Sequence, residues 1–217
     1  LTGYPFSEDI RFEIATSSAV AFPLHLRIPL WCREASVMVN GQPIRKETGG
    51  KMIVVERTWN NGDQVTLHLP MEVRISEWGR NSRSVERGPL VFALRLEERW
   101  ERGEEKTEGE YWSVYPKSDW NFGLAQQLIQ KPLENAEVKL VRPVSDDFVW
   151  NLSHAPVEII VPARKIPSWQ LVNDVAPLPV TDRNGLFKGA VSDTLEKITL
   201  IPYGCSKVRV VAFPVVR

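Results

Sequence analysis

Apolar and polar residues alternate one by one over several short segments, and this pattern limits the fold of the chain more than any other feature. Ile10, Phe12 and Ile14 alternate with charged residues, and the same alternation returns at residues 22–28 and 65–69. Successive side chains of a β-strand point to opposite faces, so a period of two predicts strands with one buried and one exposed face. We therefore expect an all-β protein.

Turn residues separate these segments at short intervals. Asn40-Gly41 suits a tight hairpin because both residues tolerate positive φ, and Gly62-Asp63 marks another turn. Pro23 lies inside one alternating segment and cannot donate a ladder hydrogen bond, which predicts an edge or bulged strand. Short strands divided by turns at this spacing are typical of β-sandwiches, including jelly-roll-like ones.

The length of 217 residues allows two modules of roughly 100 residues each. We predict two β-sandwiches in tandem, residues 1–88 and 89–217, divided at Gly88-Pro89. Residues 97–110 are mostly charged and predict a solvated loop or mobile hairpin. A short helix is expected near Leu124–Gln130, and residues 174–192 are loop-like. Later strands are expected at 137–141, 148–152, 157–161, 197–201 and 207–213.

Charge and hydropathy exclude two classes of partner. Lys and Arg together number 27, as do Asp and Glu, so the formal net charge is zero, which argues against a nucleic-acid partner. No apolar run approaches the roughly 20 residues that span a bilayer, so no membrane partner is expected. The first residues resemble neither an initiator nor a signal peptide, which suggests a start inside a longer gene product and leaves localisation unknown.

Groups that could carry chemistry are scattered. His25, His68 and His154 stand alone, whereas metal ligands cluster. Most strand carboxylates occupy outward positions, where a solvated face is the ordinary interpretation. Cys32 and Cys205 adjoin apolar strands and are expected to be buried hydrophobes rather than a disulfide or reactive thiols. We therefore predict no catalytic, cofactor-binding or metal-binding residue and no cofactor in this chain.

Tryptophan is the unusual component of the composition, with eight residues. Trp112, Trp120 and Trp169 lie near turns, where a large ring is hard to bury within a thin sandwich. Contact with another domain or partner is favoured for these three, ahead of internal packing and of a glycan-binding platform. We expect them to be partly exposed and to form one contiguous apolar area.

Six short segments, in order and spread nearly end to end, resemble one enzyme family. They are Leu26–Cys32, Val37–Gly41, Trp59–Met71, Arg87–Val91, Trp120–Leu124 and Ile201–Cys205. Together they are similar to the region downstream of the catalytic domain in the β-L-arabinofuranosidase-like enzymes, glycoside hydrolase family 127.

This resemblance implies that a catalytic (α/α)-barrel precedes two β-sandwich domains, as in the family. The family nucleophile, a zinc-bound cysteine, and the acid/base glutamate both lie in the barrel, and nothing in this chain matches the cysteine-pair motif. Cys32 aligns with a strand end in a sandwich and is not taken as a nucleophile. The missing amino-terminal catalytic domain of the same polypeptide is therefore the expected partner.

Three functions remain open from the sequence. The first is a non-catalytic structural segment of a glycoside hydrolase that acts on arabinose-containing glycans. The second is a carbohydrate-binding module with an aromatic platform, for which a glycan would be the partner. The third, with the least support, is a stand-alone enzyme.

Overall fold

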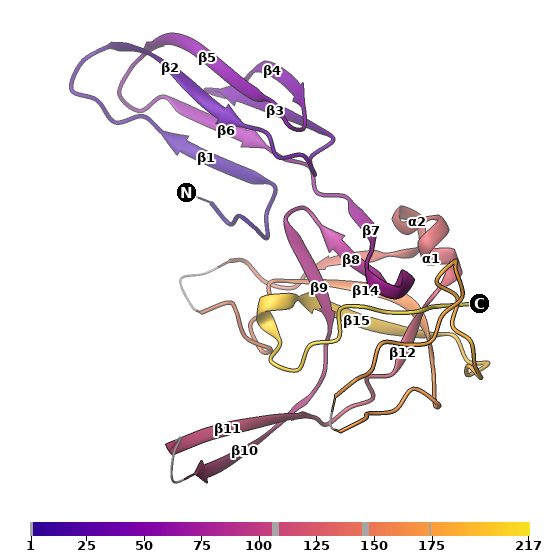
Figure 1. Ribbon diagram of the computed structural model, residues 1–217. Helices are drawn as coiled ribbons and strands as arrows, with labels where there is room; N and C mark the ends of the chain where they lie inside the picture. The colour runs from indigo at the N-terminus through magenta and orange to yellow at the C-terminus, as the bar shows by residue number, and fades with distance from the viewer. Residues whose placement is uncertain (1, 106–108, 145–147, 174) are drawn as a thin grey trace. The chain divides into compact units, whose positions relative to one another are not determined.

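The structure is a computed structural model that describes residues 2–105, 109–144, 148–173 and 175–217 (Figure 1). Strands hold 49% of the residues and helices 7%, so the all-β prediction is confirmed. Among the described residues, no helix is long and apolar enough to span a membrane.

The chain divides into two compact units, Leu1–Glu72 (unit 1) and Val73–Arg217 (unit 2). The boundary expected at residues 88–89 lies later in the chain than this division. The reason is that the strands β7 (Val73–Glu77) and β8 (Arg83–Arg87) pair with each other and, through β8, with β9 (Leu90–Leu94). Gly88 and Pro89 thus form a hairpin turn inside unit 2 rather than a linker, with Arg87 paired to Leu90 across it.

Unit 1 consists of six strands in two sheets. The strands are β1 (Asp9–Glu13), β2 (Val20–Arg27), β3 (Glu34–Val39), β4 (Gln42–Thr48), β5 (Met52–Trp59) and β6 (Gln64–His68). One sheet has the order β1-β6-β3-β4, and β2 pairs with β5 in the other. Leu26, Ile53 and Trp59 of the second sheet share one buried cluster with Val37 and Leu67 of the first. Unit 1 is therefore a two-layer sandwich, and β2, which contains Pro23, is an edge strand as predicted.

Two turns of unit 1 are held together by side-chain hydrogen bonds. Asn40 and Gly41 both have positive φ and join β3 to β4, as the sequence predicts. The Asp63 carboxylate accepts hydrogen bonds from the Asn60 backbone N–H and from the Asn40 amide, each at 2.8 Å. These two bonds, with the Arg57 guanidinium nearby, lower the pKa of Asp63. The Asn40–Gly41 and Asn60–Asp63 turns therefore stabilise each other.

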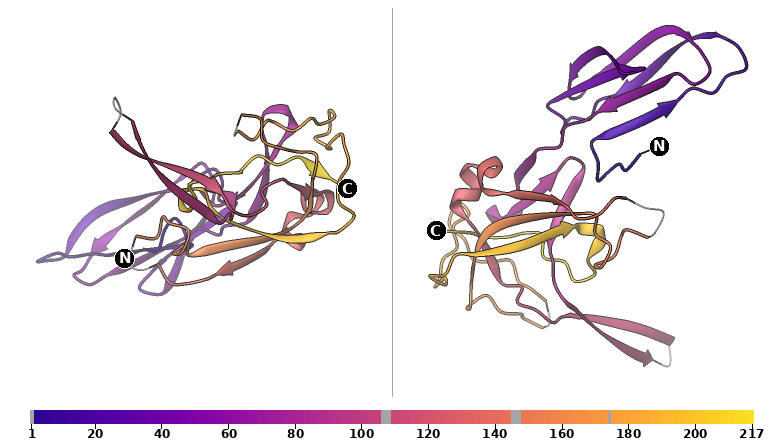
Figure 2. Two further views of the ribbon diagram at one scale, coloured as in Figure 1. Left: turned by 90° about the horizontal axis from the view of Figure 1, so that it is seen from below. Right: turned by 180° about the vertical axis from the view of Figure 1, so that it is seen from behind.

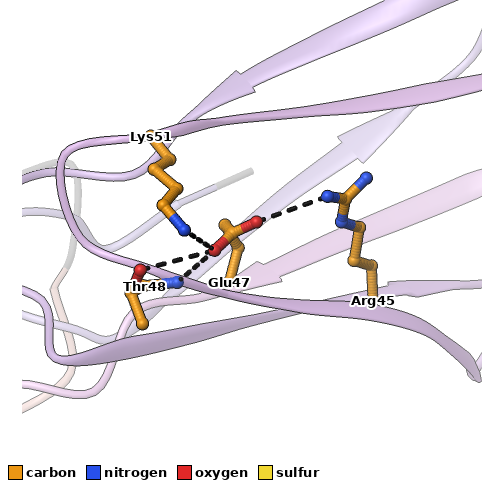
Figure 3. Close-up of polar contacts among 4 residues, drawn as sticks. All are labelled: Arg45, Glu47, Thr48 and Lys51. Carbon is orange, nitrogen blue, oxygen red and sulfur yellow. Dashed lines mark hydrogen bonds and ion pairs between the residues drawn. The ribbon is translucent and has the colours of Figure 1, made fainter.

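Glu47 is the most strongly perturbed carboxyl on unit 1 (Figure 3). Its carboxylate accepts hydrogen bonds from Lys51 Nζ and from the Thr48 backbone N–H, both at 2.9 Å, and from Arg45 Nη2 at 3.3 Å. The Lys51 bond, followed by the Thr48 N–H, lowers the pKa of Glu47 to about 2. These contacts connect the end of β4 to the turn before β5.

The Glu47→Gln variant is expected to be less stable than the wild type at neutral pH, with the difference fading as the pH falls from about 4.5 towards 2. A carboxyl whose pKa is lower in the folded state stabilises that state above its ordinary pKa of 4.5 and loses this effect on protonation. Urea titrations of both proteins at several pH values measure it. Glu34→Gln, which removes one partner of the exposed Lys46 ion pair, controls for loss of a surface charge. A difference that stays constant over this pH range would contradict the prediction.

Unit 2 is built on one eight-stranded sheet. Its further elements are β10 (Glu98–Glu105), β11 (Gly109–Pro116), β12 (Phe122–Ala125), β13 (Glu137–Leu140), β14 (Val157–Lys165), β15 (Glu196–Pro202) and β16 (Val215–Val216), the helices α1 (Gln126–Gln130) and α2 (Pro132–Asn135), and the 3₁₀ turns η1 (Gly79–Asn81) and η2 (Tyr203–Cys205). The strand order is β16-β12-β14-β15-β9-β8-β7, and β13 pairs with β14.

The carboxyl-terminal segment of unit 2 joins two distant parts of this sheet. Phe213 exchanges two backbone hydrogen bonds with Arg83 of β8, and β16 then runs parallel to β12. The sheet therefore curls round, and the layers of unit 2 belong to one sheet, unlike the two separate sheets of unit 1. The short helix expected near Leu124–Gln130 is present as α1.

The charged segment at 97–110 forms most of a two-stranded hairpin, β10 with β11, which extends away from the sheet of unit 2 (Figures 1 and 2). Its strands pair from Glu98–Pro116 to Glu105–Gly109, and residues 106–108 lie outside the described residues. Aromatic cross-strand contacts account for the pairing: the Trp100 and Trp112 rings lie 6.2 Å apart, and Arg99 stacks on Tyr115 at 4.7 Å.

Residues 148–152 and 207–213, which are among the described residues, do not form the strands predicted for them. The first folds into bends and turns, in which the Asn151 side chain accepts hydrogen bonds from the backbone of Ser153 and His154. In the second, the Val210 carbonyl accepts one hydrogen bond from Leu94 N–H and Phe213 pairs with Arg83 alone, so no continuous ladder forms. Both segments instead place side chains on the groove described next.

Candidate functional site: an aromatic groove on unit 2

Trp120 and Trp169, two of the three tryptophans singled out from the sequence, pack against each other inside unit 2. Their ring centroids are 5.0 Å apart at an interplanar angle of 67°, and both contact the buried cluster of Ile166 and Val216. The indole N–H of Trp169 donates to the Pro177 carbonyl at 2.7 Å. Trp169 is only 5% exposed, contrary to the expectation of partial exposure. A ring in such a position contributes to internal packing.

Trp112 lies elsewhere, on the β10–β11 hairpin. It is 59% exposed and meets Trp100 edge to face, at an interplanar angle of 71°. The structure thus pairs Trp112 with Trp100 instead of with Trp120 and Trp169. The two hairpin rings are far from coplanar, so they do not form the flat surface on which a sugar ring stacks.

A groove that the sequence did not reveal lies on unit 2, with a volume of about 610 Å³. We name it the aromatic groove, after three of its lining residues, Trp78, Trp150 and Tyr203. The other lining residues are Ser84, Pro89, Leu90, Val91, Gly204, Val211 and Ala212. They come from the end of β7, the β8–β9 hairpin, the turn at 148–151, η2 and the carboxyl-terminal segment.

Local contacts hold the aromatic side chains in place. The indole N–H of Trp78 donates to the Ser76 hydroxyl at 2.8 Å, and its backbone N–H donates to Ser82 O at 2.9 Å. The Arg209 guanidinium lies 4.3 Å from the centre of the Tyr203 ring. A Cβ atom on residue 204 would lie 2.5 Å from the Trp150 ring, so glycine there lets that ring pack directly on the backbone.

The groove is apolar almost throughout. Ser84 supplies the only side-chain hydroxyl besides that of Tyr203 among its lining residues, and it donates to the Val211 carbonyl at 2.7 Å. Tyr203 accepts a hydrogen bond from Arg209 at 3.3 Å. A concave surface of this character binds apolar groups, with little capacity to recognise hydroxyls.

The lining residues come from five separate stretches, which explains why no sequence pattern pointed to the groove. The available signals were Pro89-Leu90-Val91 and Tyr203-Gly204, which lie inside the fourth and the last of the six family-like segments. Trp78 directly precedes the 3₁₀ turn η1 and Trp150 lies in the bends at 148–152, whereas Trp112 lies inside strand β11.

Several titratable side chains of the described residues form contacts at the surface. His68 Nδ1 lies 2.7 Å from the Asp9 carboxylate, and His154 contacts Asn151. Glu86 pairs with Arg74 at 3.0 Å, and Glu158 pairs with Arg95. No three His, Cys, Asp or Glu residues converge as a metal site within the described part of the chain.

Both cysteines are buried and free, as the sequence suggests, and they lie in different units. Burial raises the pKa of the Cys32 thiol and raises that of Cys205 to about 11. The Cys205 thiol donates a hydrogen bond to the Val149 carbonyl. A raised pKa keeps both thiols protonated, and therefore weakly nucleophilic, near neutral pH.

Comparison with a known family gives a match over unit 1. Residues 1–71 match the family described as β-L-arabinofuranosidase, GH127 middle domain. This range ends one residue before the division between the units. No curated protein matches the chain.

Solved structures match the chain over its whole length. A glycoside hydrolase structure has 25% sequence identity and a TM-score of 0.59, and the match covers 100% of this chain and 32% of that one. A GH127 β-L-arabinofuranosidase from Geobacillus stearothermophilus T6 (23% identity, TM-score 0.58) and a GH127 β-arabinofuranosidase (22%, 0.59) each match 99% of this chain, which covers 30% and 31% of theirs. The resemblance found in the sequence is confirmed, and the chain spans about a third of these structures.

Proposed function

Because residues 1–71 match the family described as GH127 middle domain, we propose that this chain is the non-catalytic structural segment of a larger glycoside hydrolase that acts on arabinose-containing glycans. Its partner is the catalytic domain of the same polypeptide. The segment stabilises that domain and contributes no group to the chemical step.

The observation that carries this proposal is the coverage of the solved structures. The whole chain is matched, but it accounts for only 30–32% of the length of each related chain. Two-thirds of the related enzymes therefore has no counterpart here, and that part is long enough to hold a complete catalytic domain.

The arrangement of the carboxylates supports the same conclusion. Glycoside hydrolysis commonly needs two carboxyl groups that face each other across the scissile bond. Glu86 and Glu158 are each paired with an arginine on the sheet of unit 2, and Glu13 and Glu56 are exposed in unit 1. A glycan-binding platform of Trp112, Trp120 and Trp169 would need all three rings at the surface, but Trp169 is buried. We therefore do not propose this alternative.

We expect deletion of these 217 residues from the complete polypeptide to lower the melting temperature of the catalytic domain by several degrees. Removal of a supporting unit exposes the apolar surface that the unit covered. Differential scanning calorimetry of the complete and truncated polypeptides measures the shift, and hydrolysis at low temperature shows whether the truncated domain is still folded. A catalytic domain with an unchanged melting temperature would rule out a supporting role.

A further inference from the structure

The aromatic groove is open at its rim and apolar inside. Trp78 is 57% exposed and Tyr203 is 44% exposed, although both are large amphipathic rings. Trp150 and Leu90, which also line the groove, are half-buried. Large aromatic rings exposed together around a concavity are typical of a contact surface rather than of a solvated face.

A sugar is a poor occupant for this groove. A pentose carries several hydroxyls that lose their hydrogen bonds to water on burial and require protein partners in exchange. The Ser84 hydroxyl already donates to Val211 O, and the Trp78 indole N–H donates to Ser76. Because the groove offers few polar atoms that are not already engaged, it matches apolar side chains better than hydroxyls.

The groove is also preorganised. The Trp150 ring rests on Gly204, and the wall at Val211 and Ala212 is fixed on either side by the backbone bonds of Val210 and Phe213. A groove whose walls are already held in place binds a partner at a lower entropic cost than a mobile one.

The distribution of exposed apolar residues also favours a contact on unit 2. Among the described residues, most large hydrophobic side chains that are exposed belong to unit 2 and not to unit 1. This chain covers 30–32% of each solved relative, so the rest of each relative is about twice as long as this chain. The chain therefore has an exposed apolar concavity and, by the proposed function, a large neighbouring domain in the same polypeptide.

We propose that the aromatic groove is the docking site for apolar side chains of the catalytic domain, with Trp78 as an anchor. This inference rests on the proposed function and specifies the surface through which support is given. The occupant is a segment of the same polypeptide, from the two-thirds that this chain does not span.

Oxidative footprinting of the aromatic side chains, measured by mass spectrometry, tests the proposed docking site. The oxidation rates are compared between the isolated chain and the complete polypeptide. Trp112 is the matched reference, because it is 59% exposed against 57% for Trp78. We expect the two to react at similar rates in the isolated chain. In the complete polypeptide the oxidation rate of Trp78 should fall by about tenfold, because docking excludes solvent from an anchor residue. The oxidation rate of Tyr203 should fall as well. An unchanged Trp78 rate would overturn the proposal.

A pair of variants provides a second measurement. Trp78→Ala should leave the melting temperature of the isolated chain unchanged within about 1 °C, because its ring is mostly exposed, yet lower that of the catalytic domain in the complete polypeptide by about 4 °C or more. Leu30→Ala in unit 1 is the control, because that side chain is 84% exposed, and an equal loss for both variants would contradict a specific role for the groove.

Other occupants give distinct outcomes in the same experiments. Protection of Trp78 in the isolated chain by arabinofuranose oligosaccharides would establish a glycan site and overturn the proposal. Protection that grows with the concentration of the isolated chain would establish contact between two copies and also overturn it. If deletion of the segment destabilises the catalytic domain while Trp78 stays reactive, the supporting role stands and the docking surface lies elsewhere.

Discussion

Replacement of Trp59 by alanine is expected to lower the free energy of unfolding of unit 1 by about 3–5 kcal/mol, the range for removal of a fully buried aromatic side chain. Trp59 is 0% exposed at the end of β5. Its ring lies 5.7 Å from that of Phe22, and its indole N–H donates to the Phe22 carbonyl at 2.9 Å. Loss of the ring would leave a cavity between the two sheets and an unpaired carbonyl on β2.

The position of Trp59 in the chain adds to this effect. It immediately precedes the Asn60–Asp63 turn, which the Asp63 carboxylate connects to Asn40 at the end of β3. The indole therefore fixes the β5 end of a turn that sets the register of β6 against β3. The predicted cost reflects both the lost burial and this coupling.

Urea denaturation followed by circular dichroism measures the change. Trp59→Phe retains most of the ring and removes the hydrogen bond, so its loss should be smaller, about 1–2 kcal/mol. Trp112→Ala, which removes an exposed ring, should cost about 0.5 kcal/mol or less. A loss below about 0.5 kcal/mol for Trp59→Ala would mean that the ring is not in the core.

The sandwich of unit 1 was predictable because each of its signals is local. Alternation places Val37 and Val39 on one face of β3, and both are buried. The Asn40-Gly41 dipeptide adopts the positive φ angles that a two-residue hairpin requires. Neither inference needed knowledge of which segments meet in space.

The boundary between the units was less accessible from the sequence. Gly88-Pro89 carries the composition of a linker, yet a two-residue hairpin turn has the same composition, and Gly88 has the positive φ of such a turn. Sheet pairing between β8 and β9 separates the two interpretations. The alternation in β7 resembles that of the strands in unit 1, so pattern alone could not assign it to unit 2.

The candidate site was the part that sequence reasoning missed. Trp78, Trp150 and Tyr203 are separated by more than fifty residues each and meet only because unit 2 folds its carboxyl-terminal segment against β8. Conversely, Trp169 was expected at the surface. It is buried, and its indole N–H donates a hydrogen bond to the Pro177 carbonyl. Whether a tryptophan near a turn is exposed depends on such long-range contacts.

Hydrolysis of nitrophenyl β-L-arabinofuranoside, compared between the isolated chain and the complete polypeptide, tests most directly whether these residues support catalysis or perform it. We expect turnover by the complete polypeptide and, for the isolated chain, no rate above the uncatalysed background. Among the described residues, Glu86 and Glu158 are each paired with an arginine, and both thiols are buried and protonated. A parallel metal analysis of the isolated chain should give no stoichiometric zinc. Turnover by the isolated chain that a single substitution within it abolishes would contradict the account.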